Sequence, residues 1–235
     1  MAKETALVVA LDVPTLDEAV ALAEEFSGMP VWMKIGLELF TACGKDVVSA
    51  VRELGFPVFL DLKFHDIPHT VARAVASAAK LEVGMVTLHA GGGRNMLQAA
   101  GKVCEDLRQQ GLPAPLLLGV TVLTSQGPEE LGLDDEGLRA LVLERARLSQ
   151  ECGLDGVVCS GYEAGAIKTA CGENFVCLCP GIRFAGATAS HDQVRVMTPD
   201  LAAASGADFI VMGRPLREAP NPAEAAREAL GLLKR

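Results

Sequence analysis

Residues 56–80 read FPVFLDLKFHDIPHTVARAVASAAK, and their pattern is the clearest sign of the fold in this sequence. The apolar run Phe56–Leu60 leads into the charged residues Asp61 and Lys63, and Pro68 then opens a helical pattern. Apolar strands followed by amphipathic helices are typical of βα units in a parallel sheet that is covered on both faces. Proline favours the first turn of a helix. The stretch therefore predicts one βα unit with charged residues where its strand ends.

The same unit recurs along the whole chain of 235 residues. Eight βα units in this length predict a single (β/α)8 TIM barrel, as one domain over residues 1–235. A doubly wound open sheet is the alternative. The expected strands are Ala6–Val13, Val31–Leu37, Val58–Phe64, Gly84–His89, Leu116–Leu123, Gly156–Ser160, Phe175–Pro180 and Phe209–Gly213.

Composition narrows the classes of function. The net charge is −9 and Lys/Arg residues occur at most in pairs, which disfavours nucleic-acid and anionic-membrane partners. Asp12 comes too early for a signal peptide, and no apolar run approaches the roughly 18 residues of a membrane span. The seven cysteines contain no CxxC pair, and Cys177 and Cys179 share a strand face. They are interpreted as small buried hydrophobes of a reducing, cytoplasmic environment.

Polar residues stand at nearly every expected strand end. In a TIM barrel the carboxyl ends of the strands converge on one mouth, where such enzymes place their chemistry. We therefore expect a shared catalytic mouth. The residues are Asp12, Lys34, Asp61, Lys63, His89, Thr121, Thr124, Ser160, Arg183 and Arg214.

Strand alternation points Asp61 and Lys63 into the barrel and leaves Leu60 and Leu62 to pack against helices. The structural alternative is an ion pair that only satisfies itself. A buried pair often costs more in desolvation than it returns, so it is a poor stabilising device. With Asp12 and Lys34 on neighbouring strands, an alternating acid–lysine network is expected.

Other patterns around these strands have simpler interpretations. His65 and His69 in HDIPH are four residues apart, but Pro68 separates them, so a metal site is not favoured. By spacing, Asp66 could be a helix N-cap. The stretch HAGGGRN at 89–95 favours a turn before a helix, and His89 and His191 stay unassigned.

The end of the chain favours a phosphate site. FIVMGRPL, residues 209–216, is a strand followed by Gly213 and Arg214, and the last loops of a barrel are the usual phosphate site. Arg214 supplies a permanent cation, unless it only makes a surface salt bridge. The preceding stretch PGIRFAGATASHDQVRV predicts a loop over the mouth, with Arg183 and Gln193 as polar contacts.

These residues together match one known family. DLKFHDIPHT closely resembles the DxKxxDIPNT signature of orotidine 5'-phosphate decarboxylases, although His69 stands where that family usually shows Asn. Further matches span nearly the whole chain in the same order. They are ALDVP with Asp12, KIGLELF with Lys34, GVTVLTS with Thr124, PGIR with Arg183, DQVRV with Gln193, and MGRP with Gly213 and Arg214.

The resemblance implies a carboxy-lyase that converts orotidine 5'-monophosphate to UMP and CO2 as the last step of pyrimidine biosynthesis. It implies no cofactor, no metal, and a homodimer in which Asp66 and Thr70 reach the partner's site. Lys63, Asp61, Lys34 and Asp66 would be catalytic. Asp12 and Lys34 would bind the ribose, and Thr124 would bind the pyrimidine. The phosphate would be bound by Gln193, Gly213 and Arg214, and Arg183 would be part of the closing loop.

Two other functions fit part of this pattern. A sugar-phosphate decarboxylase or aldolase of the same superfamily uses Mg2+ and shares the DxKxxD core, but lacks the DIP, PGIR and DQVRV matches. A non-catalytic barrel that binds a phosphate ligand would have no need of Lys63 as a proton donor between two acids.

Overall fold

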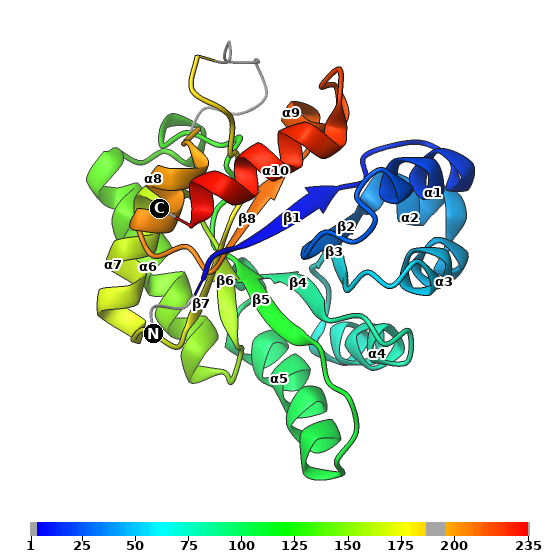
Figure 1. Ribbon diagram of the computed structural model, residues 1–235. Helices are drawn as coiled ribbons and strands as arrows, with labels where there is room; N and C mark the ends of the chain where they lie inside the picture. Colours follow the sequence, from blue (N-terminus) through cyan, green and yellow to red (C-terminus); the bar gives the residue numbers. More distant parts are fainter. Residues whose placement is uncertain (1–3, 187–195, 235) are drawn as a thin grey trace.

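The computed structural model describes residues 4–186 and 196–234, and these residues form a closed barrel of eight parallel strands in the order β1 to β8. Figure 1 shows the strands at the centre with the helices around them. The TIM barrel prediction is confirmed, and the open sheet is wrong because β1 pairs with β8. The strands are β1 Ala6–Ala10, β2 Val31–Gly36, β3 Val58–Phe64, β4 Met85–His89, β5 Leu116–Val120, β6 Gly156–Val158, β7 Val176–Cys179 and β8 Phe209–Met212.

All eight expected strands are present, but most end earlier than expected. β1 ends at Ala10 rather than Val13, and β5 ends at Val120 rather than Leu123. The reason is physical: in a barrel the strands diverge into separate loops above the mouth, so the ladder stops while the apolar pattern continues. The site residues near these ends therefore lie on loops just above the ladder.

Helices alternate with the strands, as the βα pattern predicts. Their starts follow local signals: Thr15 caps α1 through its hydroxyl, and Pro68 is the first residue of α4. The helices are α1 Leu16–Glu24, α2 Leu37–Cys43, α3 Lys45–Glu53, α4 Pro68–Ala79, α5 Arg94–Gln109, α6 Asp135–Glu151, α7 Gly161–Cys171, α8 Pro199–Ala204, α9 Arg214–Arg217 and α10 Pro222–Leu233, with 3-10 turns η1 Ala90–Gly92 and η2 Glu129–Leu131.

The core has two layers. The larger lies between strands and helices and contains Leu60, Cys177 and Cys179, while the smaller fills the barrel and contains Phe59 and Met85. Cys177 and Cys179 share a face, as predicted. Burial raises the pKa of the Cys104 thiol to about 11, which keeps it protonated and unreactive.

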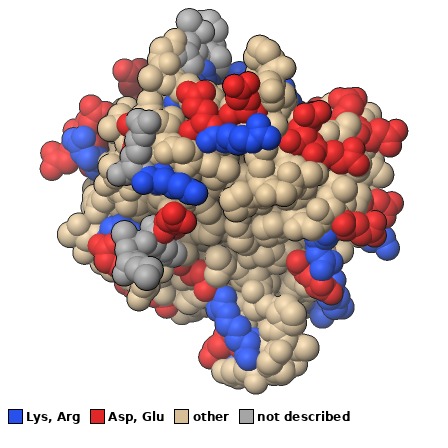
Figure 2. Space-filling model, viewed as in Figure 1, with Lys and Arg blue, Asp and Glu red and all other residues tan. Residues whose placement is uncertain are grey.

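The chain has 30 acidic and 21 basic residues. Figure 2 shows acidic side chains gathered over the N-terminal helices, whereas Lys and Arg stand as separate side chains. Exposed acids of this region are Asp17, Glu18, Glu24, Glu25 and Glu38. Within the described ranges, no helix combines the length and the apolar character needed to cross a membrane.

Candidate active site

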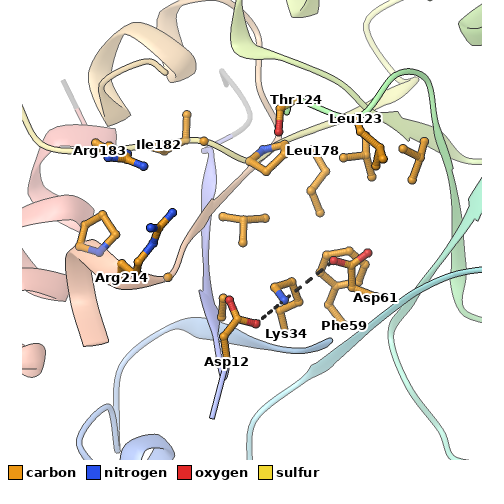
Figure 3. Close-up of a pocket in the computed structure, with 18 of the residues that line it drawn as sticks. Asp12, Lys34, Phe59, Asp61, Leu123, Thr124, Leu178, Ile182, Arg183 and Arg214 are labelled. Carbon is orange, nitrogen blue, oxygen red and sulfur yellow. Dashed lines mark hydrogen bonds and ion pairs between the residues drawn. The ribbon is translucent and has the colours of Figure 1, made fainter. Parts of the chain in front are cut away.

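A cavity of about 500 Å³ opens at the carboxyl ends of the strands (Figure 3). Its size suits a small organic ligand, and its walls come from most of the strands. Eight of the residues predicted for the site line it. They are Asp12, Lys34, Asp61, Lys63, Thr124, Arg183, Gly213 and Arg214.

Two acids and two lysines form a connected chain on one side of this cavity. Lys34 Nζ donates to Asp12 Oδ1 at 2.9 Å and lies 3.9 Å from Asp61 Oδ2. Lys63 Nζ donates to the same Asp61 oxygen at 2.9 Å. Asp61 and Lys34 are nearly buried, whereas the Asp12 side chain is 49% exposed. The expected alternating network is therefore present, and its two middle members, Lys34 and Asp61, are the most buried.

The backbone at Lys63 adopts an unusual conformation. Its φ is +50°, in the left-handed region, where a side chain with a Cβ costs about 1 kcal/mol or more. The pairing of β3 with β4 shifts register between Leu60 and Phe64. Thr87 of β4 holds this shift, because its hydroxyl accepts from Lys63 N–H at 3.0 Å and donates to Asp61 Oδ1 at 2.9 Å. One buried hydroxyl thus fixes both the acid and the lysine.

Gly36, at the end of β2, makes room for the outer pair. A Cβ at this position would lie 3.0 Å from Lys34 Nζ and 3.5 Å from Asp12 Oδ1. The contact with the ammonium is tighter than ordinary van der Waals packing allows. A glycine here lets the Lys34–Asp12 pair lie directly against the backbone.

The opposite side of the cavity carries the arginines. Figure 3 shows Arg183 and Arg214 across the cavity from Asp61, with Thr124 on a third side. Gly213 precedes α9 and lies beside Asp12: a Cβ there would lie 3.5 Å from Asp12 Oδ2, an ordinary van der Waals contact. Arg183 N–H donates to the Met197 carbonyl at 3.0 Å, which fixes the loop after β7 at its base. The cavity therefore has a cationic end and an acid–lysine end.

A known protein family matches nearly the whole chain. The model of the orotidine 5'-phosphate decarboxylase / HUMPS family matches residues 5–229. The chain belongs to this family. Orotidine 5'-phosphate decarboxylase of Nitratidesulfovibrio vulgaris is 50% identical over 221 residues, covering 94% of both chains. The enzyme of the same name from Opitutus terrae is 47% identical, covering 97% of this chain and 98% of its own.

A solved structure of the family agrees in fold over the whole chain. The crystal structure of orotidine 5'-phosphate decarboxylase from Lactobacillus acidophilus superimposes with a TM-score of 0.85 at 32% identity, covering 99% of this chain and 100% of its own.

Asp66 and Thr70 are two predicted site residues that do not line the cavity with the others. Asp66 and Thr70 are exposed at the β3–α4 connection, outside the cavity lining. Asp66 is not the N-cap of α4; that position is Ile67, and the Asp66 carboxylate accepts from Ile67 N–H at 2.7 Å. Gln193, like His191, lies outside the described residues.

Three of the polar strand-end residues expected at the mouth, Thr121, Ser160 and His89, do not line the cavity. Ser160 caps α7 in a capping box with Glu163. The buried Thr121 hydroxyl donates to the Val158 carbonyl at 3.0 Å. Both hydroxyls satisfy the backbone where strands become loops, a need that the sequence pattern does not distinguish from a role in the site.

His89 also lies outside the cavity lining and stacks on His65, with ring centroids 5.1 Å apart. Burial, followed by the nearby His65 and Lys63, lowers the pKa of His89. His65 precedes α4 and His69 lies within it, so the pair does not share a continuous helix. Among the described residues, no group of three or more His, Cys, Asp or Glu side chains could hold a metal ion.

Sequence reasoning missed two residues, Thr87 and Arg217. Thr87 is the one hydroxyl in the apolar strand MVTLH, and this was the available signal. Arg217 lines the cavity three residues after Arg214, on the same short helix. Its position in the sequence is typical of a surface arginine, and only the closure of the barrel brings it to Asp12.

Proposed function

We propose that this protein decarboxylates orotidine 5'-monophosphate to UMP and CO2, without a cofactor. The main support is the network of ion pairs Asp12–Lys34–Asp61–Lys63 at the mouth of a barrel of this family. The opposite, cationic end of the cavity suits the phosphate of a nucleotide.

The chemical difficulty lies in the charge left behind by CO2. The bond between C6 and the carboxyl carbon breaks, and its electron pair stays on C6 in an sp2 orbital that no carbonyl delocalises. In this proposal Lys63 meets that charge as a preformed ammonium, then donates its proton to C6. The lysine ends neutral and regains a proton from solvent after UMP leaves.

Asp61 would keep Lys63 charged and aimed. Its Oδ2 accepts from Lys63 and lies near Lys34, while its Oδ1 accepts from Thr87. Both oxygens are therefore held, so the carboxylate has little freedom to turn. A group fixed in this way contributes to catalysis because it needs no reorganisation when the charge develops.

The phosphate would be bound by Gly213 and Arg214 at the start of α9, with Arg183 from the loop after β7. Gln193 is assigned to the same group by resemblance. The phosphate is remote from the bond that breaks, so its binding energy serves to orient and enclose the pyrimidine against Lys63. Thr124, on a third side of the cavity, is assigned to the pyrimidine.

Asp66 and Thr70 would act across a homodimer. Their segment is exposed in one chain, and Ile67 between them is 66% exposed. An exposed apolar residue next to an exposed acid at the rim of a site is the arrangement that a second subunit would cover. In this proposal Asp66 enters the partner's cavity.

The function is tested by adding orotidine 5'-monophosphate to metal-stripped protein and following the ultraviolet absorbance of the orotate ring. Decarboxylation that chelator leaves unchanged is expected. The Lys63→Ala variant should fold and bind UMP within about tenfold of wild type, yet lose nearly all turnover. If Lys63→Ala keeps a tenth of the wild-type kcat, the role of Lys63 is wrong. Turnover of a sugar phosphate that requires Mg2+ would replace the proposal with the rival activity.

A further inference from the structure

Arg217 ties the end of β1 to α9. Its guanidinium donates from Nη1 to the backbone carbonyl of Asp12 and from Nη2 to Glu218 Oε1 at 2.9 Å. Glu218 is the next residue along the chain, so that second contact is local. The contact with Asp12 joins residues 205 positions apart in the sequence. Arg217 also lines the cavity, so this tie is part of the site's wall.

Asp12 is a residue that needs such support. It lies beyond the end of β1, and its half-exposed carboxylate is not fixed by packing. Lys34 holds one carboxylate oxygen, and Gly213 stands close to the other. The helix α9 therefore approaches Asp12 at two points: Gly213 beside the carboxylate and Arg217 at the carbonyl. An acid on a loop is oriented only if its backbone is held as well as its side chain.

We propose that Arg217 is a positioning residue that fixes Asp12, so that the Asp12 carboxylate and Lys34 present one rigid pair to the ribose; this inference rests on the proposed function. Arg217 acts through Asp12 and does not itself bind the nucleotide. Because Arg214 and Arg217 belong to the same turn of helix, the phosphate end and the ribose end of the cavity share one support. The competing assignment makes Arg217 a second cation on the phosphate.

A double-mutant cycle separates the two assignments. We expect Arg217→Met to lower kcat/KM for orotidine 5'-monophosphate by about tenfold, the order expected for one hydrogen bond from a charged donor. In an Asp12→Ala background the same change should matter by less than about twofold, because the residue to be positioned has lost its carboxylate. An equal loss in both backgrounds would make Arg217 a direct ligand and overturn the proposal, as would an Arg217→Met variant that equals wild type.

Two further variants guard against a general structural effect. Arg217→Lys keeps one donor and should restore part of the loss. Glu218→Gln removes the local ion pair but leaves the bond to Asp12, and Glu218 is exposed and outside the cavity lining, so its kinetics should match wild type. A Glu218→Gln variant as impaired as Arg217→Met would place the effect in the fold of α9 and overturn the proposal.

Amide hydrogen exchange gives a readout that needs no substrate. The amides just after β1, at residues 11–13, should exchange faster in Arg217→Met than in wild type, while those of β5 should not change. Unchanged exchange at residues 11–13 would overturn the inference whether or not the protein turns over the nucleotide. If wild type does not decarboxylate orotidine 5'-monophosphate, the proposed function fails, and the exchange result alone decides whether Arg217 fixes Asp12.

Discussion

Replacing Thr87 by valine should show how far the free energy of unfolding and kcat each depend on the hydrogen bonds that hold Asp61 and Lys63. Thr87 is fully buried, and its hydroxyl makes two bonds, to the Asp61 carboxylate and from Lys63 N–H. Valine keeps the shape and the β-branched preference for a strand. It leaves one charged acceptor and one backbone donor without their partner, so the change is almost purely a loss of hydrogen bonds.

The magnitude follows from the two bonds. A hydrogen bond to a charged group contributes about 1.5–3 kcal/mol and a neutral one about 1 kcal/mol. The strained backbone at Lys63 can relax once its N–H is released, which returns part of that cost. We expect the free energy of unfolding to fall by roughly 2–3 kcal/mol, which corresponds to a melting temperature lower by about 4–12 °C for a chain of this size.

Turnover should fall further than stability alone explains. Without Thr87 the Asp61 carboxylate can turn, and the ammonium of Lys63 is no longer aimed at one point. We expect kcat to fall by at least about tenfold, with a smaller change in KM, because the lost interaction acts on the developing charge. Urea titration gives the stability, and the absorbance assay gives kcat at a temperature where both proteins are folded.

Two controls make the result decisive. Thr87→Ser keeps the hydroxyl and should keep most of kcat. Thr121→Val removes another fully buried threonine hydroxyl, but one that donates to a neutral carbonyl, so it should cost about 1 kcal/mol of stability and leave kcat unchanged. A Thr87→Val enzyme with wild-type kcat, or one no less stable than Thr121→Val, would refute the reasoning.

Three other predictions concern the interface, the pH dependence and the phosphate. Mixing Asp66→Asn with Lys63→Ala should regenerate activity in a heterodimer with one intact mouth; no recovery after verified subunit exchange contradicts shared sites. Because burial lowers the pKa of His89, unfolding becomes easier as the pH falls below about 6.5, and His89→Gln should flatten that slope in urea titrations. Arg214→Ala should slow the nucleotide strongly yet leave the nucleoside orotidine almost unaffected; equal slowing would make Arg214 structural.

The barrel could be predicted because each strand is buried on both faces, so the apolar runs stand out from the helices between them. The sequence could not fix where the strands end, since that depends on where neighbouring strands diverge. Alternation correctly placed Asp61 and Lys63 on one face. The left-handed backbone at Lys63 depends on the register of β3 against β4 and on Thr87, which lies 24 residues away.

The contacts that span the chain were the hardest to predict. Arg217 reaches Asp12 only because β8 lies beside β1, a consequence of barrel closure. Its residue type and spacing carry no sign of this. Ser160 shows the reverse error, since a polar residue at a strand end was assigned to the mouth and instead caps a helix. Local patterns identify the residues able to act in a site, and topology decides which of them meet.

The network Asp12–Lys34–Asp61–Lys63 is better explained by an interaction with a ligand than by a contribution to stability. Two acids and two lysines sum to zero, and holding them at a partly buried site costs more in desolvation than such a pair usually returns. The left-handed backbone at Lys63 adds strain, and the Thr87 hydroxyl holds that backbone by accepting from Lys63 N–H. A network that served stability alone would be improved by replacing these residues with apolar ones. In the proposed mechanism, that free energy is recovered when a negative charge forms beside Lys63, because the neutral network then gains an interaction that it lacked in the ground state.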